Sequence, residues 1–257
     1  MNHETLHDKV AIVTGGARGI GRAIVHGLAA AGADVVIADL REDEADSVAR
    51  AIQGETGRTV VPIRTDVTDL ADVEQLAART LDRFGRIDSL VNSAGWDQLK
   101  PFMKTTPELW DRVLAINFRG VVHTCHAVLP AMVGAKRGSI VNISSDTARV
   151  GSFGEAIYAS AKAATIAFSK TLAREHARDG IRVNVICPGL VDTALLEEMR
   201  EDPFTNRILD AIVGLIPLRR MGTPDEVAPL AVFLCADSAS YITGQVVSVN
   251  GGLNMVG

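Results

Sequence analysis

The chain has 257 residues, of which 47% are hydrophobic, and its formal net charge at pH 7 is -5. This length suffices for one large α/β domain or two small ones. The negative charge argues against a nucleic-acid binder, which needs a basic face, and no apolar run approaches the ~20 residues of a membrane span. The polar segment 1–9 lacks a signal-peptide core, and three scattered cysteines make no disulfide framework, so we expect a cytoplasmic protein.

Short β-branched runs alternate with helical patterns along almost the whole chain. Continuous apolar runs are typical of strands that are buried on both faces of a parallel sheet. We predict strands at residues 10–14, 35–39, 60–64, 90–92, 139–144, 182–187 and 246–250. The main helices are predicted at residues 21–31, 73–84, 110–132, 158–178 and 224–234. The alternation predicts a single α/β domain, a Rossmann-type doubly wound parallel sheet with right-handed crossovers.

Helix starts and one irregular segment complete this pattern. Asp69, Thr106 and Thr223 are predicted N-caps, because short polar side chains there can accept hydrogen bonds from the first helical turn. The alternation of strand and helix patterns is interrupted at residues 190–222, a long segment of mixed polar and apolar residues with Pro203 and Pro217. We interpret this segment as a lid over a substrate; the alternative is a helical insertion that only packs.

A glycine-rich loop follows the first predicted strand and precedes the first helix. Its sequence is Gly15-Gly16-Ala17-Arg18-Gly19-Ile20-Gly21. Glycines allow a sharp turn and close approach of a pyrophosphate, which the free N–H groups of the helix start can bind. This position between strand and helix makes the motif much more specific than glycines alone. We therefore predict that Gly15, Arg18, Gly19, Ile20 and Gly21 contact a dinucleotide.

The end of the second strand bears on which dinucleotide binds. Asp39 lies 18 residues beyond Gly21, where a carboxylate accepts hydrogen bonds from the adenosine ribose and repels a 2′-phosphate. Arg18 and Arg41 argue for NADP, but we give the acid more weight and predict NAD. Asp66 and Val67, at the end of the third strand, are predicted to meet the adenine; alternatively, Asp66 caps the next turn.

Tyr158 and Lys162 lie four residues apart in a predicted helix, so both side chains project from one face. A free tyrosine has a pKa near ~10, and a nearby cation favours the phenolate. Such a phenol can take a proton from an alcohol or return one to a ketone. The pair alone is weak evidence, because the same spacing occurs on ordinary amphipathic helices.

Together with further motifs, this pair resembles the short-chain dehydrogenase/reductase family over the whole chain. The additional motifs are Asn92-Ser93-Ala94-Gly95, Asn117, Ser145 and Pro188-Gly189 with Thr193. The resemblance implies that Tyr158 is the acid/base, that Lys162 binds the nicotinamide ribose and lowers the phenol pKa, that Ser145 binds the substrate oxygen, and that Asn117 holds a water beside the lysine.

The resemblance also implies the rest of the cofactor site and an assembly. Asn92, Ala94 and Gly95 would lie along the adenosine and ribose, while the nicotinamide would contact Pro188, Gly189, Val191 and Thr193. Ser93 departs from the asparagine that is usual in the family. The family likeness further implies a homotetramer. Related enoyl reductases use a wider tyrosine-to-lysine spacing, which favours chemistry at a C–O bond here.

A closer likeness, to the 2-hydroxycyclohexanecarboxyl-CoA dehydrogenases, is carried by Gly95-Trp96-Asp97, Lys100-Pro101-Phe102 and Gly154-Glu155-Ala156, among other segments. It implies a cyclic β-hydroxyacyl-CoA substrate. We expect Trp96 and Phe153 to wall a ring pocket and Arg149 or Lys100 to meet the acyl-CoA. Other residues expected to shape the pocket are Phe102, Glu155 and Leu195. For each of these residues, a surface or core role is the alternative.

Two other functions and a metal site are the alternatives to this interpretation. The rival enzyme is an NADPH-dependent reductase of 3-oxoacyl-ACP or 3-oxoacyl-CoA; the rival class is a non-catalytic dinucleotide sensor, which has no need of a tyrosine, lysine, serine and asparagine together. His123 and His126, with Cys125 between them, offer at most two metal ligands on one apolar helix. We therefore expect packing there and no metal.

Overall fold

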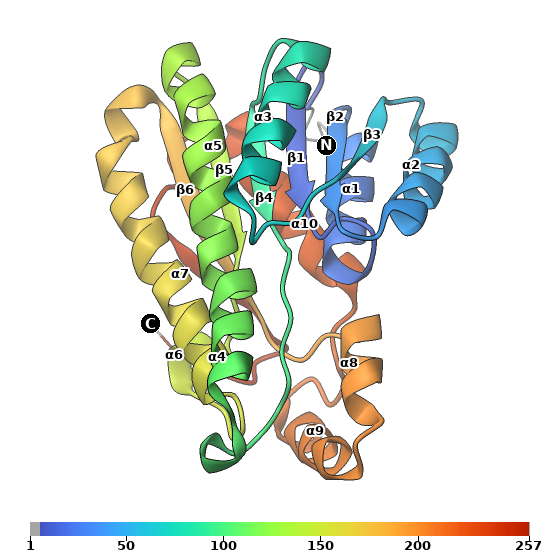
Figure 1. Ribbon diagram of the computed structural model, residues 1–257, viewed down its shortest axis with the longest axis vertical. Helices are drawn as coiled ribbons and strands as arrows, with labels where there is room; N and C mark the ends of the chain where they lie inside the picture. The colour runs from blue at the N-terminus through green and yellow to red at the C-terminus, as the bar shows by residue number, and fades with distance from the viewer. Residues whose placement is uncertain (1–5, 257) are drawn as a thin grey trace.

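The computed structural model describes residues 6–256, so the first five residues of the polar N-terminal segment lie outside the described part. Strands form one sheet in the order β3-β2-β1-β4-β5-β6-β7, and every pairing among the described residues is parallel (Figure 1). The strands are β1 (Val10–Thr14), β2 (Asp34–Asp39), β3 (Val60–Arg64), β4 (Ser89–Asn92), β5 (Gly138–Ile143), β6 (Ile181–Pro188) and β7 (Val246–Val249).

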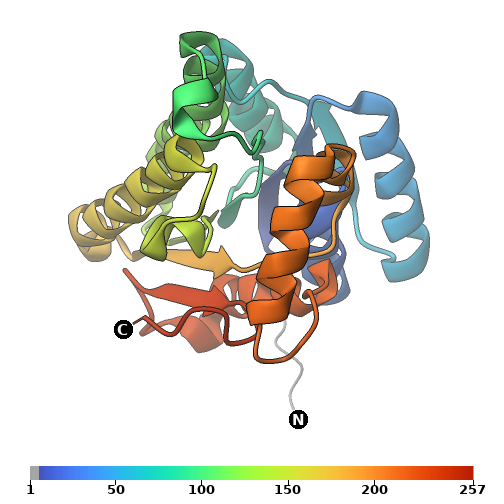
Figure 2. The same cartoon turned by 90° about the horizontal axis from the view of Figure 1, so that it is seen from below.

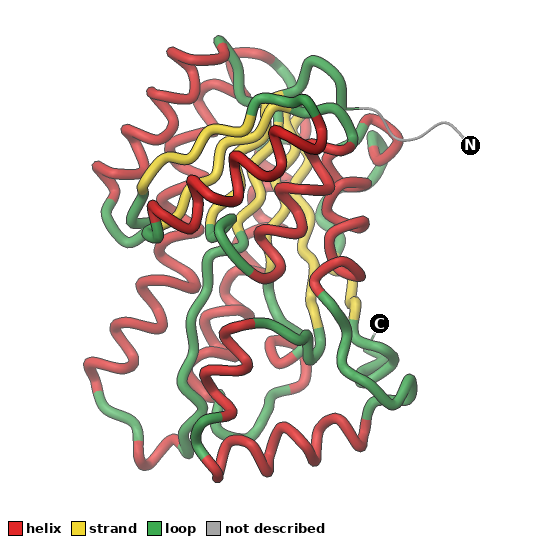
Figure 3. The backbone as a smooth tube through the Cα atoms, turned by 90° about the vertical axis from the view of Figure 1, so that its right-hand side faces the viewer, coloured by secondary structure: helices red, strands yellow, loops and turns green. Residues whose placement is uncertain are grey.

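Helices cover both faces of the sheet, which lies between them in Figure 3. The helices are α1 (Gly19–Ala30), α2 (Glu42–Thr56), α3 (Leu70–Phe84), α4 (Pro107–Leu114), α5 (Gly120–Ala135), α6 (Thr147–Val150), α7 (Ala156–Glu175), α8 (Ala194–Arg200), α9 (Pro203–Leu215) and α10 (Pro224–Cys235). Short 3₁₀ turns occur at Phe102–Lys104, Ala177–Asp179 and Asp237–Ala239. The predicted doubly wound fold is confirmed. No helix of the described part is long and apolar enough to cross a membrane.

The core explains why the strands are apolar at every position. Val13 packs in the hydrophobic cluster under α1, α2 and α10, whereas its neighbour Ile12 packs in the cluster under α3, α5 and α7. Both side chains are fully buried. Successive residues of a strand point to opposite faces, so burial of both faces requires an unbroken apolar run.

The helix predicted at residues 110–132 is not continuous. The structure has α4, then a π-helical turn η2 (Ala115–Arg119), then α5. A π turn places one extra residue in the helix and is frequent at functional sites. Here it carries Asn117, whose side-chain Nδ2 donates to the Val113 carbonyl oxygen at 3.0 Å. Apolar periodicity alone does not reveal such an insertion, since the surrounding turns keep their buried face.

The predicted N-caps and the irregular segment are found where expected. Asp69 accepts from the Ala71 N–H at 2.9 Å and Thr106 from the Leu109 N–H at 3.5 Å. At Thr223 it is the backbone N–H that donates, to Glu226 Oε2 at 2.9 Å. Residues 190–222 form α8 and α9, which lie together beyond the carboxyl ends of the strands (Figures 1 and 2).

The turn from β1 into α1 depends on glycines. Gly15 and Gly19 have φ values of +66° and +54°, in the left-handed region. Gly21 packs so tightly that an added Cβ would lie 2.1 Å from the Gly15 carbonyl oxygen. The loop therefore closes on itself and leaves no room for a side chain at Gly21.

We predict that Gly21→Ala lowers the free energy of unfolding by ~1–3 kcal/mol, the usual cost of overpacking, and weakens dinucleotide binding. Gly54→Ala is the matched control: this glycine is in α2 with nothing within 4 Å of an added Cβ. The control should gain ~0.5–1 kcal/mol from helix propensity. Denaturant unfolding and cofactor titration measure both effects; equal stability of the two variants would contradict the prediction.

Candidate active site

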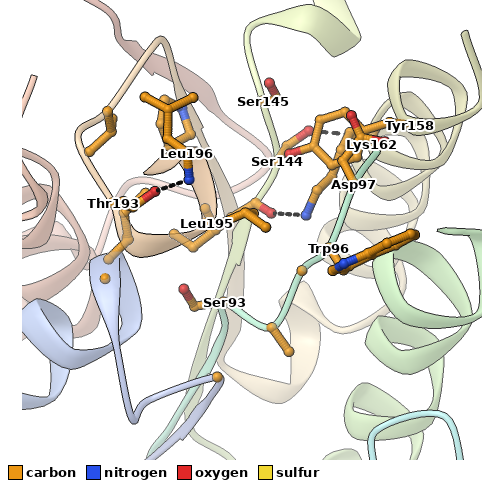
Figure 4. A pocket seen from close by; sticks show the side chains of 18 of the residues that line it. Ser93, Trp96, Asp97, Ser144, Ser145, Tyr158, Lys162, Thr193, Leu195 and Leu196 are labelled. Atoms are coloured by element: carbon orange, nitrogen blue, oxygen red, sulfur yellow. Dashed lines mark hydrogen bonds between the residues drawn. The ribbon is translucent and has the colours of Figure 1, made fainter. Parts of the chain in front are cut away.

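A cavity of about 1030 Å³ opens at the carboxyl ends of the central strands. The strand order reverses between β1 and β4, and ligands of open α/β sheets bind at such a switch point. One part, the dinucleotide lobe, is lined by the glycine loop and the ends of β2 and β3. The other, the substrate lobe, lies between the start of α7, the loop after β4 and helices α8 and α9 (Figure 4).

Nearly all predicted cofactor residues line this cavity. They are Gly15, Arg18, Gly19, Ile20, Gly21, Asp39, Asp66, Val67, Ala94, Gly95, Tyr158, Lys162, Pro188, Gly189, Val191 and Thr193. Asn92 is the exception, because it does not line the cavity. Its Nδ2 donates to Asn142 Oδ1 at 2.8 Å and its Oδ1 accepts from Thr124 at 2.7 Å, so its buried amide joins β4, β5 and α5 beneath the cavity.

Carboxylates dominate the adenosine end of the dinucleotide lobe. Asp39 is buried and accepts the N–H groups of Ala17 and Arg41, each at 3.0 Å, so its charge is fixed beside the glycine loop. The Arg18 guanidinium pairs with Glu198 Oε1 at 2.6 Å, which connects the loop to α8. Arg41 Nε lies 3.4 Å from Glu44 Oε1. Each of the two arginines that argue for NADP is therefore paired with a glutamate.

Two further details of this lobe refine the sequence interpretation. Asp66 lines the cavity and also caps a turn, because its Oδ1 accepts from the N–H of Thr68 at 2.8 Å. Thr14, which directly precedes the glycine loop, accepts the N–H groups of Ser93 and Ala94 at 3.1 and 3.2 Å. Thr14 therefore holds the backbone at Ser93, so this position does not need the asparagine side chain that is usual in the family.

Three of the four predicted catalytic side chains meet where β5 faces α7. Ser145, Tyr158 and Lys162 all line the cavity. The neighbouring Ser144 is buried, and its hydroxyl donates to the Lys162 carbonyl oxygen at 2.9 Å, so it fastens α7 to the end of β5. Lys162 is also buried, and its Nζ donates to the Ile143 carbonyl oxygen at 3.0 Å (Figure 4). The same Nζ lies 5.7 Å from the centre of the Tyr158 ring.

The pKa of Tyr158 shifts in the opposite direction from the one expected. Burial raises the pKa of the phenol, the charges of Glu155 and Asp97 raise it further, and a hydrogen bond with Ser145 opposes the rise. Burial also lowers the pKa of Lys162 to about 8. A lysine that is itself costly to charge gives little support to a phenolate, so the protein side chains alone keep Tyr158 protonated.

Asn117 lies behind the cavity and does not line it. This fully buried side chain donates to the Trp96 carbonyl oxygen at 2.6 Å and accepts from the Trp96 N–H at 3.3 Å. A Cβ on Gly95 would lie 3.1 Å from Asn117 Oδ1 and 3.5 Å from Lys162 Nζ. The absence of a side chain at Gly95 therefore lets the asparagine approach the lysine.

The predicted substrate residues divide into two groups. Trp96 and Leu195 line the cavity, and the Arg112 guanidinium lies 3.8 Å from the centre of the Trp96 ring. Arg149 does not: it donates to Ser248 Oγ at 2.9 Å and to the Val256 carbonyl oxygen at 2.6 Å, so it holds the C-terminal segment instead of meeting a substrate.

Phe153 and Phe102 also lie outside the cavity lining. Phe153 is 61% exposed, and its ring centre is 6.2 Å from that of Phe204 in α9. It therefore touches the predicted lid from outside and does not wall a ring pocket. Phe102 is half-exposed and stacks on Trp110 at 5.9 Å. Lys100 contributes its backbone, whose N–H donates to the Gly154 carbonyl oxygen at 2.9 Å.

Asp97 is the residue of the substrate lobe that sequence reasoning missed. It is 7% exposed, it lines the cavity, and its Oδ2 is buried with no hydrogen-bond partner. Burial first, and then the charge of Glu155, raise the pKa of Asp97 to about 7. Glu155 was expected in the pocket, and its place three residues before Tyr158 puts both on one helix face. Nothing in the sequence indicated that the two acids meet.

The described residues contain no group of three or more histidine, cysteine or acidic side chains that could hold a metal ion. His123 contacts the Val67 carbonyl oxygen through Nδ1 at 3.0 Å.

Comparison with known proteins assigns the family. The sequence profile described as "Enoyl-(Acyl carrier protein) reductase" matches residues 15–254. The chain belongs to the short-chain dehydrogenase/reductase family. Members of this family use a nicotinamide dinucleotide, in keeping with the lining of the dinucleotide lobe.

Relatives of this short-chain dehydrogenase/reductase chain match over nearly their full lengths. The 3-oxoacyl-[acyl-carrier-protein] reductase FabG of Escherichia coli is 38% identical over 256 residues, 100% of both chains. The acetoacetyl-CoA reductase of Shinella zoogloeoides is 42% identical over 245 residues, 95% of this chain and 98% of the relative. The crystal structure of gox2181 superimposes with a TM-score of 0.92 at 36% identity, covering 98% of this chain and 97% of that one.

These names bear on the closer likeness drawn from the sequence. The family is confirmed, but these curated relatives are named for 3-oxoacyl or acetoacetyl thioesters and not for a cyclohexane ring. The short segments around Trp96 and Glu155 that carried the ring assignment line the cavity without identifying a ring. The ring-specific assignment therefore has no support from these relatives.

We predict that Lys162→Met stabilises the fold at pH 7 while abolishing activity. The folded-state pKa of about 8 lies below the ordinary 10.5, so the unfolded chain binds more protons between these values and stability rises with pH there. Below pH 8 the charged Lys162 lowers the free energy of unfolding by the full cost of its burial. Methionine has no charge and so no such cost, but it also lacks the hydrogen bond to Ile143, so we expect a net increase in the free energy of unfolding of ~1–2 kcal/mol. Unfolding at pH 7 and 10.5 checks this; a gain that does not shrink at the higher pH would contradict it.

Proposed function

We propose that this protein is an NAD-dependent oxidoreductase that interconverts 3-oxoacyl and 3-hydroxyacyl thioesters. The observation that carries the proposal is the meeting of Ser145, Tyr158 and Lys162 at the boundary of the two lobes. A dinucleotide sensor would have no use for two hydroxyl donors at that point. The thioester class is supported by the names of the acetoacetyl-CoA and 3-oxoacyl-carrier relatives.

Ser145, Tyr158 and Lys162 have separate roles in the proposed carbonyl reduction. A bound nicotinamide supplies the hydride, or accepts it in the reverse direction. The Ser145 hydroxyl donates a hydrogen bond to the carbonyl oxygen, and the Tyr158 O–H gives this oxygen its proton as negative charge develops there. The phenol is held in its protonated form by burial and by the two nearby acids. Lys162 binds the ribose and, with Asn117 behind it, leads protons back to the phenol.

The cofactor proposal rests on charge at the end of β2. Asp39 is fixed by two backbone N–H groups, so it has little freedom to turn away from a 2′-phosphate. Arg18 and Arg41 are the cations that would have to offset that repulsion, and each lies beside a glutamate. These contacts favour NAD, which offers ribose hydroxyls at the same place.

The part of the cavity under α8 and α9 offers an apolar surface for the acyl group. Helices α8 and α9 contribute the aliphatic side chains of Leu195, Leu196, Met199, Leu209, Ile212 and Leu215 to the cavity. We propose that this segment is a lid that covers the acyl part, with Phe153 and Phe204 in contact at its outer edge. A flat Trp96 wall, held by Arg112, accepts a ring or a chain, so a cyclic hydroxyacyl-CoA is one member of the proposed class. The homotetramer and the cytoplasmic location stay predictions.

We predict that Tyr158→Phe lowers kcat by ~10²–10⁴-fold, the usual worth of a positioned general acid, while NAD binding is retained. Ser145→Ala and Ser144→Ala form a matched pair of neighbouring hydroxyls. Only the first should lower kcat strongly, because the second serine is bonded to the Lys162 carbonyl oxygen. Steady-state kinetics and NADH titration give both quantities; full activity of Tyr158→Phe would refute the mechanism.

A substrate panel tests the thioester class. We expect acetoacetyl-CoA to be reduced with a higher kcat/KM than the plain cyclic ketone cyclohexanone, and 2-enoyl-CoA not to be reduced. 2-Hydroxycyclohexanecarboxyl-CoA, assayed with NAD in the oxidative direction, tests the ring-specific alternative. Preference for plain ketones over every thioester would overturn the proposed class, and reduction of the enoyl thioester would overturn C–O chemistry.

For the cofactor, Asp39→Ala should raise the NADP-to-NAD ratio of kcat/KM by on the order of 10²-fold. Two like charges ~5 Å apart at an effective dielectric constant of ~20 repel by ~3 kcal/mol. Asp39→Asn keeps the side-chain shape and one hydrogen-bond acceptor, so its comparison with Asp39→Ala separates the effect of the charge from the effect of the side-chain volume. A wild-type enzyme that already prefers NADPH would show that Asp39 does not select the cofactor.

A further inference from the structure

One backbone hydrogen bond and one close packing contact build an acidic site in the substrate lobe, to which the proposed mechanism gives no role in choosing the substrate. The Lys100 N–H donates to the Gly154 carbonyl oxygen at 2.9 Å, which fastens the loop after β4 to the start of α7. Gly154 has a φ of +84°, and a Cβ there would lie 2.7 Å from Leu99 Cδ2. This tight junction brings Asp97, from one segment, against Glu155, from the other.

The two acids differ in their surroundings. Glu155 begins α7, where the helix dipole favours a negative charge, and its Oε2 accepts from the Thr147 hydroxyl at 2.8 Å. Asp97 is more than nine-tenths buried, and its Oδ2 has no partner although the residue lines the cavity. Figure 4 places Asp97 directly beside Tyr158 and Lys162. A buried carboxyl oxygen without a partner is costly, so its position calls for a role.

The cations around this pair are engaged elsewhere. Lys162 points its ammonium at the Ile143 carbonyl oxygen, and Arg112 covers the Trp96 ring at 3.8 Å. Tyr158 is the remaining titratable group that faces the pair, and burial keeps it neutral. Because the pKa of Asp97 is about 7, Asp97 gains its negative charge as the pH rises through neutrality. Lys162, with a pKa of about 8, loses its positive charge at slightly higher pH, so the substrate lobe becomes more negative as the pH rises.

We propose that Asp97 and Glu155 select substrates by charge: the pair excludes 3-oxo acids with a free carboxylate and admits their neutral amides, esters and thioesters. This inference rests on the proposed function, because it assumes that a 3-oxoacyl group enters the substrate lobe. A carboxylate two carbons from the reacting carbonyl must lie in the same small lobe as the pair. Like charges about 5 Å apart, at an effective dielectric constant of about 20, reduce binding by on the order of 100-fold.

The test compares acetoacetate with acetoacetamide, which has nearly the same shape but no charge. With the purified enzyme and NADH, the amide should have the higher kcat/KM, by at least tenfold at pH 6 and by about 100-fold at pH 8. Acetoacetate stays anionic over this range, so a preference that grows with pH reports the ionisation of Asp97 together with the loss of the Lys162 charge. A side chain that only supports the fold would not change this ratio with pH.

Asp97→Asn should weaken the pH dependence and lower the preference for the amide at least tenfold, and Glu155→Gln should lower that preference too. Asp192→Asn, which removes an exposed carboxylate at the start of the predicted lid, is the control and should leave the ratio unchanged. If Asp97→Asn fails to fold by circular dichroism, Glu155→Gln decides. An unchanged ratio in the variants, or a wild-type enzyme that prefers the acid, would overturn the proposal.

Acetoacetyl-CoA is assayed in parallel to separate this proposal from the function on which it rests. If the enzyme reduces the amide with the expected pH dependence but not the thioester, the thioester assignment fails and charge selection stands. If it reduces the thioester and treats acid and amide alike, charge selection fails and the proposed function stands.

Discussion

The site depends on how α7 is fastened to the end of β5. The Ser144 hydroxyl donates to the Lys162 carbonyl oxygen, and the Lys162 ammonium donates to the Ile143 carbonyl oxygen. The last residue of β5 and the residue after it therefore hold Lys162 by both its backbone and its side chain. This double contact fixes the rotation of the helix about its axis. It therefore decides that Tyr158, one turn earlier, faces the same cavity as Ser145. The cost is a buried cation, which the fold must offset through packing elsewhere.

A second constraint acts from the opposite wall. The π turn places the Asn117 amide so that it bonds both the N–H and the carbonyl oxygen of Trp96. The loop after β4 is thereby held against the lysine, and Gly95 is small enough to allow the approach. A regular helix would present residue 117 in a different direction. The same loop carries Asp97 toward α7, so one irregular turn organises both the lysine environment and the acidic pair.

These features show why some of the site follows from sequence and some does not. The strands were predicted within one or two residues, because burial on both faces demands apolar side chains at every position, as at Ile12 and Val13. Tyr158 and Ser145 were found through helical spacing and family resemblance. Arg149 was misplaced because its partner Ser248 lies far along the chain. A charged side chain looks the same in sequence whether it faces a ligand or a neighbouring strand, and the same is true of the amide of Asn92.

The electrostatics of the site favour one protonation state over the other. Phenolate formation at Tyr158 is opposed by burial and by two acids, while the lysine that would support it is itself hard to charge. A phenol held protonated is the form that can give a proton to a ketone, whereas alcohol oxidation needs the phenolate first. A positive charge brought near the ring, such as the nicotinium of an oxidised dinucleotide, would offset the acids. The acidic pair would thus tie the protonation of the tyrosine to the redox state of the cofactor: the phenol is the form that reduction needs, and a nicotinium would favour the phenolate that oxidation needs.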